Sequence, residues 1–222
     1  MKKHTRINDT FLRSVEKPLL IFFAKKMPKW VNPDVLTSLG FLASIVVGVS
    51  YLLTNINKNF LWLASIGIFL NWFGDSLDGT LARFRKIERP RYGYFLDHTV
   101  DCVSQTMIIL GFGLSPYVDY KLASLVLTGY LSLSILTYII TNVESVFKFS
   151  YGKMGPTEAR IIAIIANTIG YYYGSSTIQL PLIGKVTSIN LIFVFVAIFT
   201  YISFFETAIK KIIHLSKIDR KK

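Results

Sequence analysis

The chain has 222 residues, of which 52% are hydrophobic, and its mean hydropathy is +0.46. This composition is too apolar for an ordinary soluble domain. A formal net charge of +12 would suggest a nucleic-acid partner for a soluble protein. Several apolar segments are long enough to span a bilayer, however, so we expect a membrane protein without a nucleic-acid partner.

The N-terminal segment, residues 1–34, is polar and basic before any apolar run begins, so we predict no cleaved signal peptide. Within it, residues 8–27 combine apolar side chains at helical spacing with four basic residues. The pattern predicts an amphipathic helix that lies along the cytoplasmic membrane interface or packs over the helical bundle. We expect Pro18 to interrupt this helix or to begin a second one.

Six apolar segments follow and predict an all-α integral membrane protein with six transmembrane helices. They are residues 35–53, 60–83, 93–114, 121–147, 158–173 and 186–210. Residues 35–210 therefore form one membrane domain in this prediction, and residues 211–222 form a basic cytoplasmic tail.

The positions of the basic residues predict how these helices are oriented. If the amino terminus is cytoplasmic, the outer loops contain Lys58, Lys121 and Lys185. The other 22 of the 25 Lys and Arg residues (25 minus 3) then lie on the cytoplasmic side. This positive-inside asymmetry places both termini in the cytoplasm, and the basic layer would attract anionic lipid headgroups.

Four acidic residues stand near the cytoplasmic ends of the second and third predicted transmembrane helices. Asp75 and Asp78 are three positions apart, and Asp97 and Asp101 are four apart, so each pair lies on one helical face. The short basic loop between the helices makes them antiparallel neighbours, which allows the two faces to meet. Carboxylates inside a membrane helix are costly and need compensation. As hard oxygen ligands, these four suit Mg²⁺, Mn²⁺ or Ca²⁺.

The residues beside the acids favour a phosphate-bearing ligand. Gly79 and Ala82 are small and would let a ligand approach the backbone. Arg83 would hold a phosphate through a forked hydrogen bond. The alternatives are close helix packing at Gly79 and ion pairing of the acids with Arg83, Arg85 or Arg91.

Together these residues form the ordered pattern D-x2-D-G-x2-A-R followed by G-x3-D-x3-D. The chain fills its positions with Asp75, Asp78, Gly79, Ala82, Arg83, Gly93, Asp97 and Asp101. The pattern resembles the signature of the CDP-alcohol phosphotransferase family. The spacer from 84 to 92 is one residue longer than usual, which a loop can absorb.

The resemblance implies a homodimeric enzyme of phospholipid synthesis whose active site faces the cytoplasm. An acceptor hydroxyl would attack the β-phosphate of a CDP-alcohol and release CMP. Two divalent ions, Mg²⁺ or Mn²⁺, would be held by Asp75, Asp78, Asp97 and Asp101, with Asp101 a ligand or the general base. The implied substrate-binding residues are Gly79, Ala82, Arg83, Gly93 and, from the NPDVLT stretch, Asn32 and Thr37.

Two further features resemble the branch that acts on choline and ethanolamine. His98 follows the third aspartate in FLDHTVD and would be the general base there, or else an orienting residue beside it. Glu158, in GPTEAR, would attract the substrate's ammonium group, although helix capping is the alternative.

We therefore predict transfer from CDP-choline or CDP-ethanolamine to diacylglycerol. The alternative is a CDP-diacylglycerol-dependent enzyme whose acceptor is glycerol phosphate, inositol phosphate or serine. In that case the basic loop that holds Arg85, Lys86, Arg89 and Arg91 would bind an acceptor phosphate. A divalent-cation transporter, the third hypothesis, would need polar residues on both sides of the bilayer, and the outer helix halves are nearly free of acids.

Overall fold

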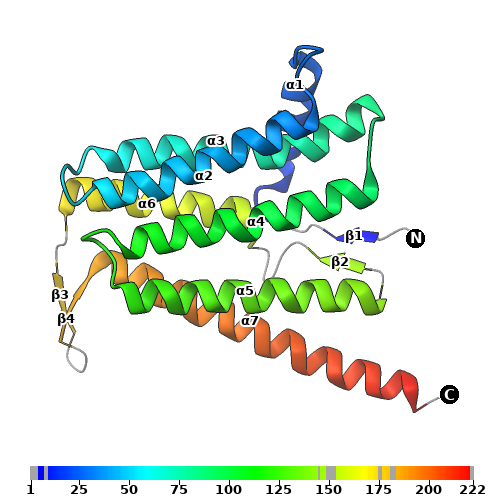
Figure 1. Cartoon of the computed structure of the whole chain (residues 1–222). Coiled ribbons are helices and arrows are strands. Elements are labelled where there is room, and N and C mark those ends of the chain that lie inside the picture. Colours follow the sequence, from blue (N-terminus) through cyan, green and yellow to red (C-terminus); the bar gives the residue numbers. More distant parts are fainter. Residues whose placement is uncertain are drawn as a thin grey trace.

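The computed structural model describes residues 5–7, 10–144, 146–148, 154–174, 177–180 and 184–220. Helices make up most of the part it describes. They are α1 (Arg13–Lys26), α2 (Pro33–Leu53), α3 (Phe60–Arg85), α4 (Pro90–Gly113), α5 (Tyr120–Glu144), α6 (Pro156–Tyr173) and α7 (Ser188–Asp219). Figure 1 shows α2 to α7 as an elongated bundle, with α1 projecting at one end and both chain termini at that same end.

Two small sheets lie at opposite ends of the bundle (Figure 1). Strand β1 (Thr5–Ile7) pairs in parallel with β2 (Val146–Lys148), near the chain termini. Strand β3 (Thr177–Leu180) pairs antiparallel with β4 (Gly184–Thr187) at the other end. The helix predicted to reach residue 147 therefore ends at Glu144, because β2 follows it.

The other predicted helices form, with shifted ends. Helix α4 begins at Pro90 rather than residue 93, since proline suits the first helical turn, and Gly93 lies inside the helix. Helix α7 begins at Ser188, after Thr187 accepts a 3.2 Å hydrogen bond from the Asn190 amide. It continues to Asp219, so residues 211–219 of the predicted tail are helical.

Among the described residues, four helices are long and apolar enough to cross a membrane, namely α2, α3, α5 and α7. Large apolar side chains such as Leu42, Phe69, Ile135 and Phe195 are exposed on these helices, which suits contact with lipid. We describe the chain as an integral membrane protein on this basis. The spans of α4 and α6, and the cytoplasmic orientation, stay predictions.

Helix α1 runs unbroken through Pro18, so the expected interruption is wrong. Its buried face explains this, because Leu20 and Ala24 pack against Leu77 and Leu81 of α3 and hold the helix in place. The opposite face exposes large apolar side chains. These are Val15, Leu19 and Phe22, and Phe11 is exposed just before the helix begins.

Helices α2 and α3 bring their backbones close together at two glycines, Gly40 and Gly74. A Cβ atom on Gly74 would lie 2.5 Å from the Leu36 carbonyl oxygen and 2.7 Å from the Gly40 amide nitrogen. One turn earlier, the Asn71 side chain donates a 3.0 Å hydrogen bond to the Gly40 carbonyl oxygen. Any larger residue at 74 must therefore move one backbone away from the other.

We predict that Gly74→Ala lowers the unfolding free energy by about 1–3 kcal/mol, because the added methyl group overpacks two backbones. Thermal unfolding of the purified protein in detergent would measure this. Gly93→Ala is the matched control, since no atom lies within 4 Å of its Cβ position. Equal unfolding midpoints for the two variants would contradict the close α2–α3 contact.

Candidate active site

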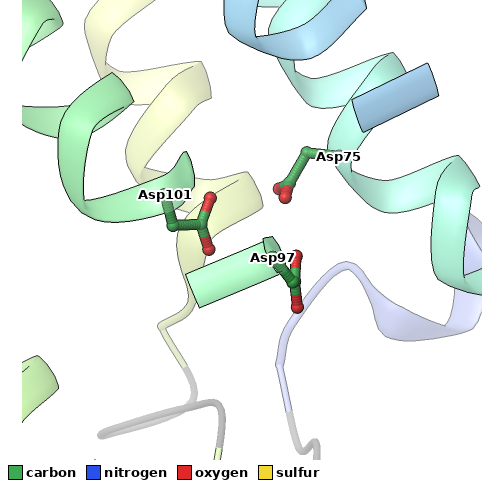
Figure 2. A group of neighbouring side chains, drawn as sticks. All are labelled: Asp75, Asp97 and Asp101. Atoms are coloured by element: carbon green, nitrogen blue, oxygen red, sulfur yellow. The ribbon is translucent and has the colours of Figure 1, made fainter. Parts of the chain in front are cut away.

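Three of the four predicted aspartates converge between α3 and α4. Asp75 comes from α3, and Asp97 and Asp101 come from successive turns of α4. One carboxylate oxygen of each lies within 4.8 Å of the other two. Figure 2 shows these carboxylates facing a shared space. This donor set fits a divalent cation that prefers oxygen ligands.

The cluster contacts a buried arginine that the sequence analysis did not single out. Arg160, on α6, donates through Nη2 to Asp75 Oδ2 at 2.7 Å and through Nε to Asn71 Oδ1 at 2.9 Å. A single guanidinium group contributes one positive charge beside three carboxylates. The remaining negative charge favours a bound cation. The sequence did offer a signal for this residue, because Arg160 is a charged residue within the predicted membrane span 158–173.

Asp78 is directed differently from the other three aspartates. Its Oδ2 accepts a 2.6 Å hydrogen bond from the Thr37 hydroxyl of α2, and its Oδ1 accepts one from the Gly79 amide. Thr37 and Asp78 are both buried. The structure thus joins two predicted site residues, while the metal-ligand role of Asp78 stays a prediction.

Arg83, the predicted phosphate-binding residue, lies over Gly79. A Cβ atom on Gly79 would lie 3.2 Å from Arg83 Nη1, so glycine leaves room for the guanidinium group above the helix. Arg83 is exposed and donates to the Thr80 hydroxyl at 3.2 Å. Ala82 is half-buried on the same turn, and Gly93 is exposed on α4. Their substrate-binding roles stay predictions.

Two predicted residues have structural contacts at helix ends. Asn32 caps α2, since its Oδ1 accepts a 2.9 Å hydrogen bond from the Val35 amide. Buried Glu158 accepts hydrogen bonds from the Leu12 amide at 3.0 Å and the Gly155 amide at 2.9 Å, one on each oxygen. This geometry supports the capping alternative for Glu158 rather than contact with an ammonium group.

His98 lies beside the cluster among aromatic rings. Its centroid is 4.3 Å from that of Tyr94 and 5.0 Å from that of Tyr138. Its Nδ1 is 3.7 Å from Asp97 Oδ2, which is close enough for an electrostatic contact but long for a hydrogen bond. The ring could therefore orient Asp97, and its role as general base stays a prediction.

Two arginines of the basic loop are engaged within the chain. The Arg85 guanidinium group donates to the carbonyl oxygens of Met27, Pro28 and Val31, which fixes the connection between α1 and α2. Arg89 pairs with Asp34, and this hydrogen bond raises the pKa of its guanidinium group. These contacts favour structural roles for both arginines.

The model of the CDP-alcohol phosphatidyltransferase family matches residues 30–214, which include the whole acidic cluster. The chain belongs to this family. The resemblance predicted from the aspartate pattern is therefore confirmed, and this CDP-alcohol phosphatidyltransferase is an enzyme, as predicted.

The phosphatidyltransferase is similar to two archaeal proteins, each named archaetidylinositol phosphate synthase. That of Pyrococcus horikoshii is 33% identical over 99 residues, which cover 45% of this chain and only half (50%) of that protein. That of Methanothermobacter thermautotrophicus is 28% identical over 170 residues, which cover 75% of this chain and 81% of that protein.

The fold of the phosphatidyltransferase is similar to a solved membrane-lipid enzyme. The phosphatidylinositol phosphate synthase of Mycobacterium tuberculosis, with CDP-DAG bound, superposes with a TM-score of 0.62. The alignment covers 87% of this chain and 91% of that one, at 17% sequence identity. At this identity the likeness establishes the fold alone.

We predict that Arg160→Met destabilises the phosphatidyltransferase by up to roughly 3–5 kcal/mol in EDTA, because it leaves Asp75 in a partly buried cluster without its guanidinium partner. Thermal unfolding with EDTA and then with Mg²⁺ would measure this. Mg²⁺ should recover part of the loss, since a cation offsets the same charge.

The matched control for Arg160→Met is Lys210→Met. Lys210 forms an exposed ion pair with Glu206 on α7, and such pairs contribute about 0–1 kcal/mol. An Arg160→Met protein as stable as this control would show that Arg160 does not compensate the cluster.

Proposed function

We propose that the protein transfers the lipid-bearing phosphate group of a CDP-linked lipid to a hydroxyl group of inositol phosphate and releases CMP. The observation that carries this proposal is the convergence of Asp75, Asp97 and Asp101 in a chain of this family. The acceptor follows from the relatives, because the names of all three contain inositol phosphate.

This acceptor is the one that the sequence analysis gave as the alternative. The main prediction, transfer from CDP-choline or CDP-ethanolamine to diacylglycerol, relied on His98 and on Glu158. Both carboxylate oxygens of Glu158 accept hydrogen bonds from backbone amides. The names of the relatives favour inositol phosphate over choline or ethanolamine. We therefore set the main prediction aside.

In the proposed reaction, the acceptor oxygen attacks the lipid-linked phosphorus while the bond from that phosphorus to the bridging oxygen breaks. CMP leaves with the bridging oxygen, and the hydroxyl proton passes to a base. Cations bound by the aspartates would supply charge neutralisation of the pyrophosphate. Asp75 and Asp97 would hold them, with Asp101 beside them in the cluster and Asp78 supporting the site from its hydrogen bond to Thr37.

Arg83 is suited to contact a phosphate of the nucleotide. Its exposed guanidinium group lies over Gly79, one residue from Asp78, and presents paired donors whose planar geometry matches a phosphate. For the acceptor phosphate, we propose Lys86 and Arg91. Lys86 follows α3, Arg91 lies in the first turn of α4, and both are exposed, whereas Arg85 and Arg89 are engaged in contacts within the chain.

We propose Asp101 as the general base, with His98 orienting Asp97. The Asp101 carboxylate belongs to the group of converging oxygens, whereas His98 faces Asp97 at 3.7 Å. A cytoplasmic active site and a homodimer remain part of the proposal, as the family resemblance and the positive-inside charge imply.

We predict that purified protein with Mg²⁺ or Mn²⁺ releases CMP from a CDP-linked lipid only when inositol phosphate is the acceptor. CDP-diacylglycerol and CDP-archaeol would each be offered inositol phosphate, glycerol phosphate or serine. CDP-choline and CDP-ethanolamine with diacylglycerol form the opposing arm. Turnover in that arm alone would restore the main sequence-based prediction, and no turnover in any arm would reject the proposed function.

We further predict that Asp101→Asn lowers kcat by about 10²- to 10⁴-fold, the usual contribution of a general base. His98→Ala should lower kcat by less than about tenfold, since it removes only an orienting contact. Steady-state CMP release at saturating Mg²⁺ would compare them. The reverse order of effects would identify His98 as the base.

A further inference from the structure

One carboxylate oxygen of Glu16, on α1, connects three helices. Its Oε1 accepts hydrogen bonds from Trp72 Nε1 at 2.8 Å and from the Thr157 hydroxyl at 2.7 Å. The Ser76 hydroxyl donates to the same oxygen at 3.4 Å. Trp72 and Ser76 belong to α3, and Thr157 belongs to the first turn of α6.

These donors lie next to the groups that build the acidic cluster. Trp72 and Ser76 stand on either side of Asp75 along α3, one turn apart. Thr157 precedes Arg160 by three residues on α6, and Arg160 is the cation that binds Asp75 at 2.7 Å. Glu16 therefore holds both the turn that carries Asp75 and the turn that carries its arginine partner.

Helix α1 is fixed at two further points, so Glu16 is not a flexible side chain on a loose helix. The Leu12 amide donates to Glu158 of α6 at 3.0 Å. Leu20 and Ala24 pack against α3 through Leu77 and Leu81. Helix α1 therefore contacts both α3 and α6 at the end of the bundle that contains the cluster, where α3 and α6 also pack directly on each other.

We propose that Glu16 is a positioning residue of the metal centre, which fixes Asp75 relative to Arg160 from outside the predicted membrane domain. The proposal deepens the proposed function and rests on its metal site. Groups that orient metal ligands typically change metal affinity or activity by about 10- to 100-fold when they are removed.

The test measures Mn²⁺ affinity directly, with purified full-length protein in detergent and no lipid or nucleotide substrate. The electron paramagnetic resonance signal of free Mn²⁺ gives the dissociation constant. We expect Glu16→Ala to weaken Mn²⁺ binding by about 10- to 100-fold. Glu16→Gln keeps an acceptor oxygen for the same three donors, so its affinity should stay within about threefold of the wild type.

Thr157→Val and Thr157→Ser form a second pair in case Glu16→Ala does not fold. The valine removes one donor to Glu16 while keeping the side-chain shape, so it should weaken Mn²⁺ binding in the same direction. The serine restores the hydroxyl group and should restore the affinity. Glu206→Ala is the control, because it removes an exposed carboxylate on α7 and should leave Mn²⁺ affinity unchanged.

Each outcome decides the proposal. Wild-type Mn²⁺ affinity in Glu16→Ala, or an equal loss in Glu206→Ala, would overturn it. A lower unfolding midpoint with unchanged affinity would show that Glu16 only stabilises the fold. If the wild type binds Mn²⁺ but transfers no lipid phosphate to any acceptor, the proposed function fails while the role of Glu16 is still decided. A wild type that does not bind Mn²⁺ would reject both.

Discussion

The structure depends on how three carboxylates are accommodated at one end of a largely apolar helical bundle. Asp75, Asp97 and Asp101 bring oxygens within 4.8 Å of one another, and mutual repulsion opposes this arrangement. Arg160 compensates part of the charge from α6, and the Asn71 side-chain oxygen accepts a hydrogen bond from Nε of the same guanidinium group. The packing of α3 against α6 brings the Arg160 guanidinium group to the cluster, and the excess negative charge gives the site its preference for cations.

The packing of α2 against α3 involves residues that also hold the acidic side chains in place. Asn71 donates to the Gly40 carbonyl oxygen as well as accepting from Arg160, so the α2–α3 contact and the charge compensation share one side chain. Gly74 stands next to Asp75, and the closeness of the two backbones there also brings the Thr37 hydroxyl to Asp78. A small displacement of α2 would therefore disturb the hydrogen bond from Thr37 to Asp78 and the position of Asn71, which also binds Arg160.

Much of this could be predicted from the sequence, because it depends on local patterns. Apolar runs located the helices, and the spacing of Asp75, Asp97 and Asp101 placed them on facing surfaces. The rest depends on contacts between distant residues. Arg160 and Glu16 meet their partners 85 and 56 residues away, and no local spacing signals such pairs. The pairing of β1 with β2 is likewise a contact between distant residues. Pro18 was expected to break α1, but the packing of α1 against α3 outweighs the cost of a proline inside the helix. Glu158 combines both cases. Its capping of α6 could be predicted from the local sequence, whereas its contact with Leu12 could not.

The helical continuation of α7 to Asp219 has a consequence for how the protein is shortened or tagged. Lys211 lies in this continuation and pairs with Glu144, at the end of α5. A chain cut at residue 210 would lose that ammonium group and leave a half-buried carboxylate on α5 facing an empty position. An affinity tag joined after Asp219 would instead extend from a complete helix, at the end of the bundle where the amino terminus also lies (Figure 1).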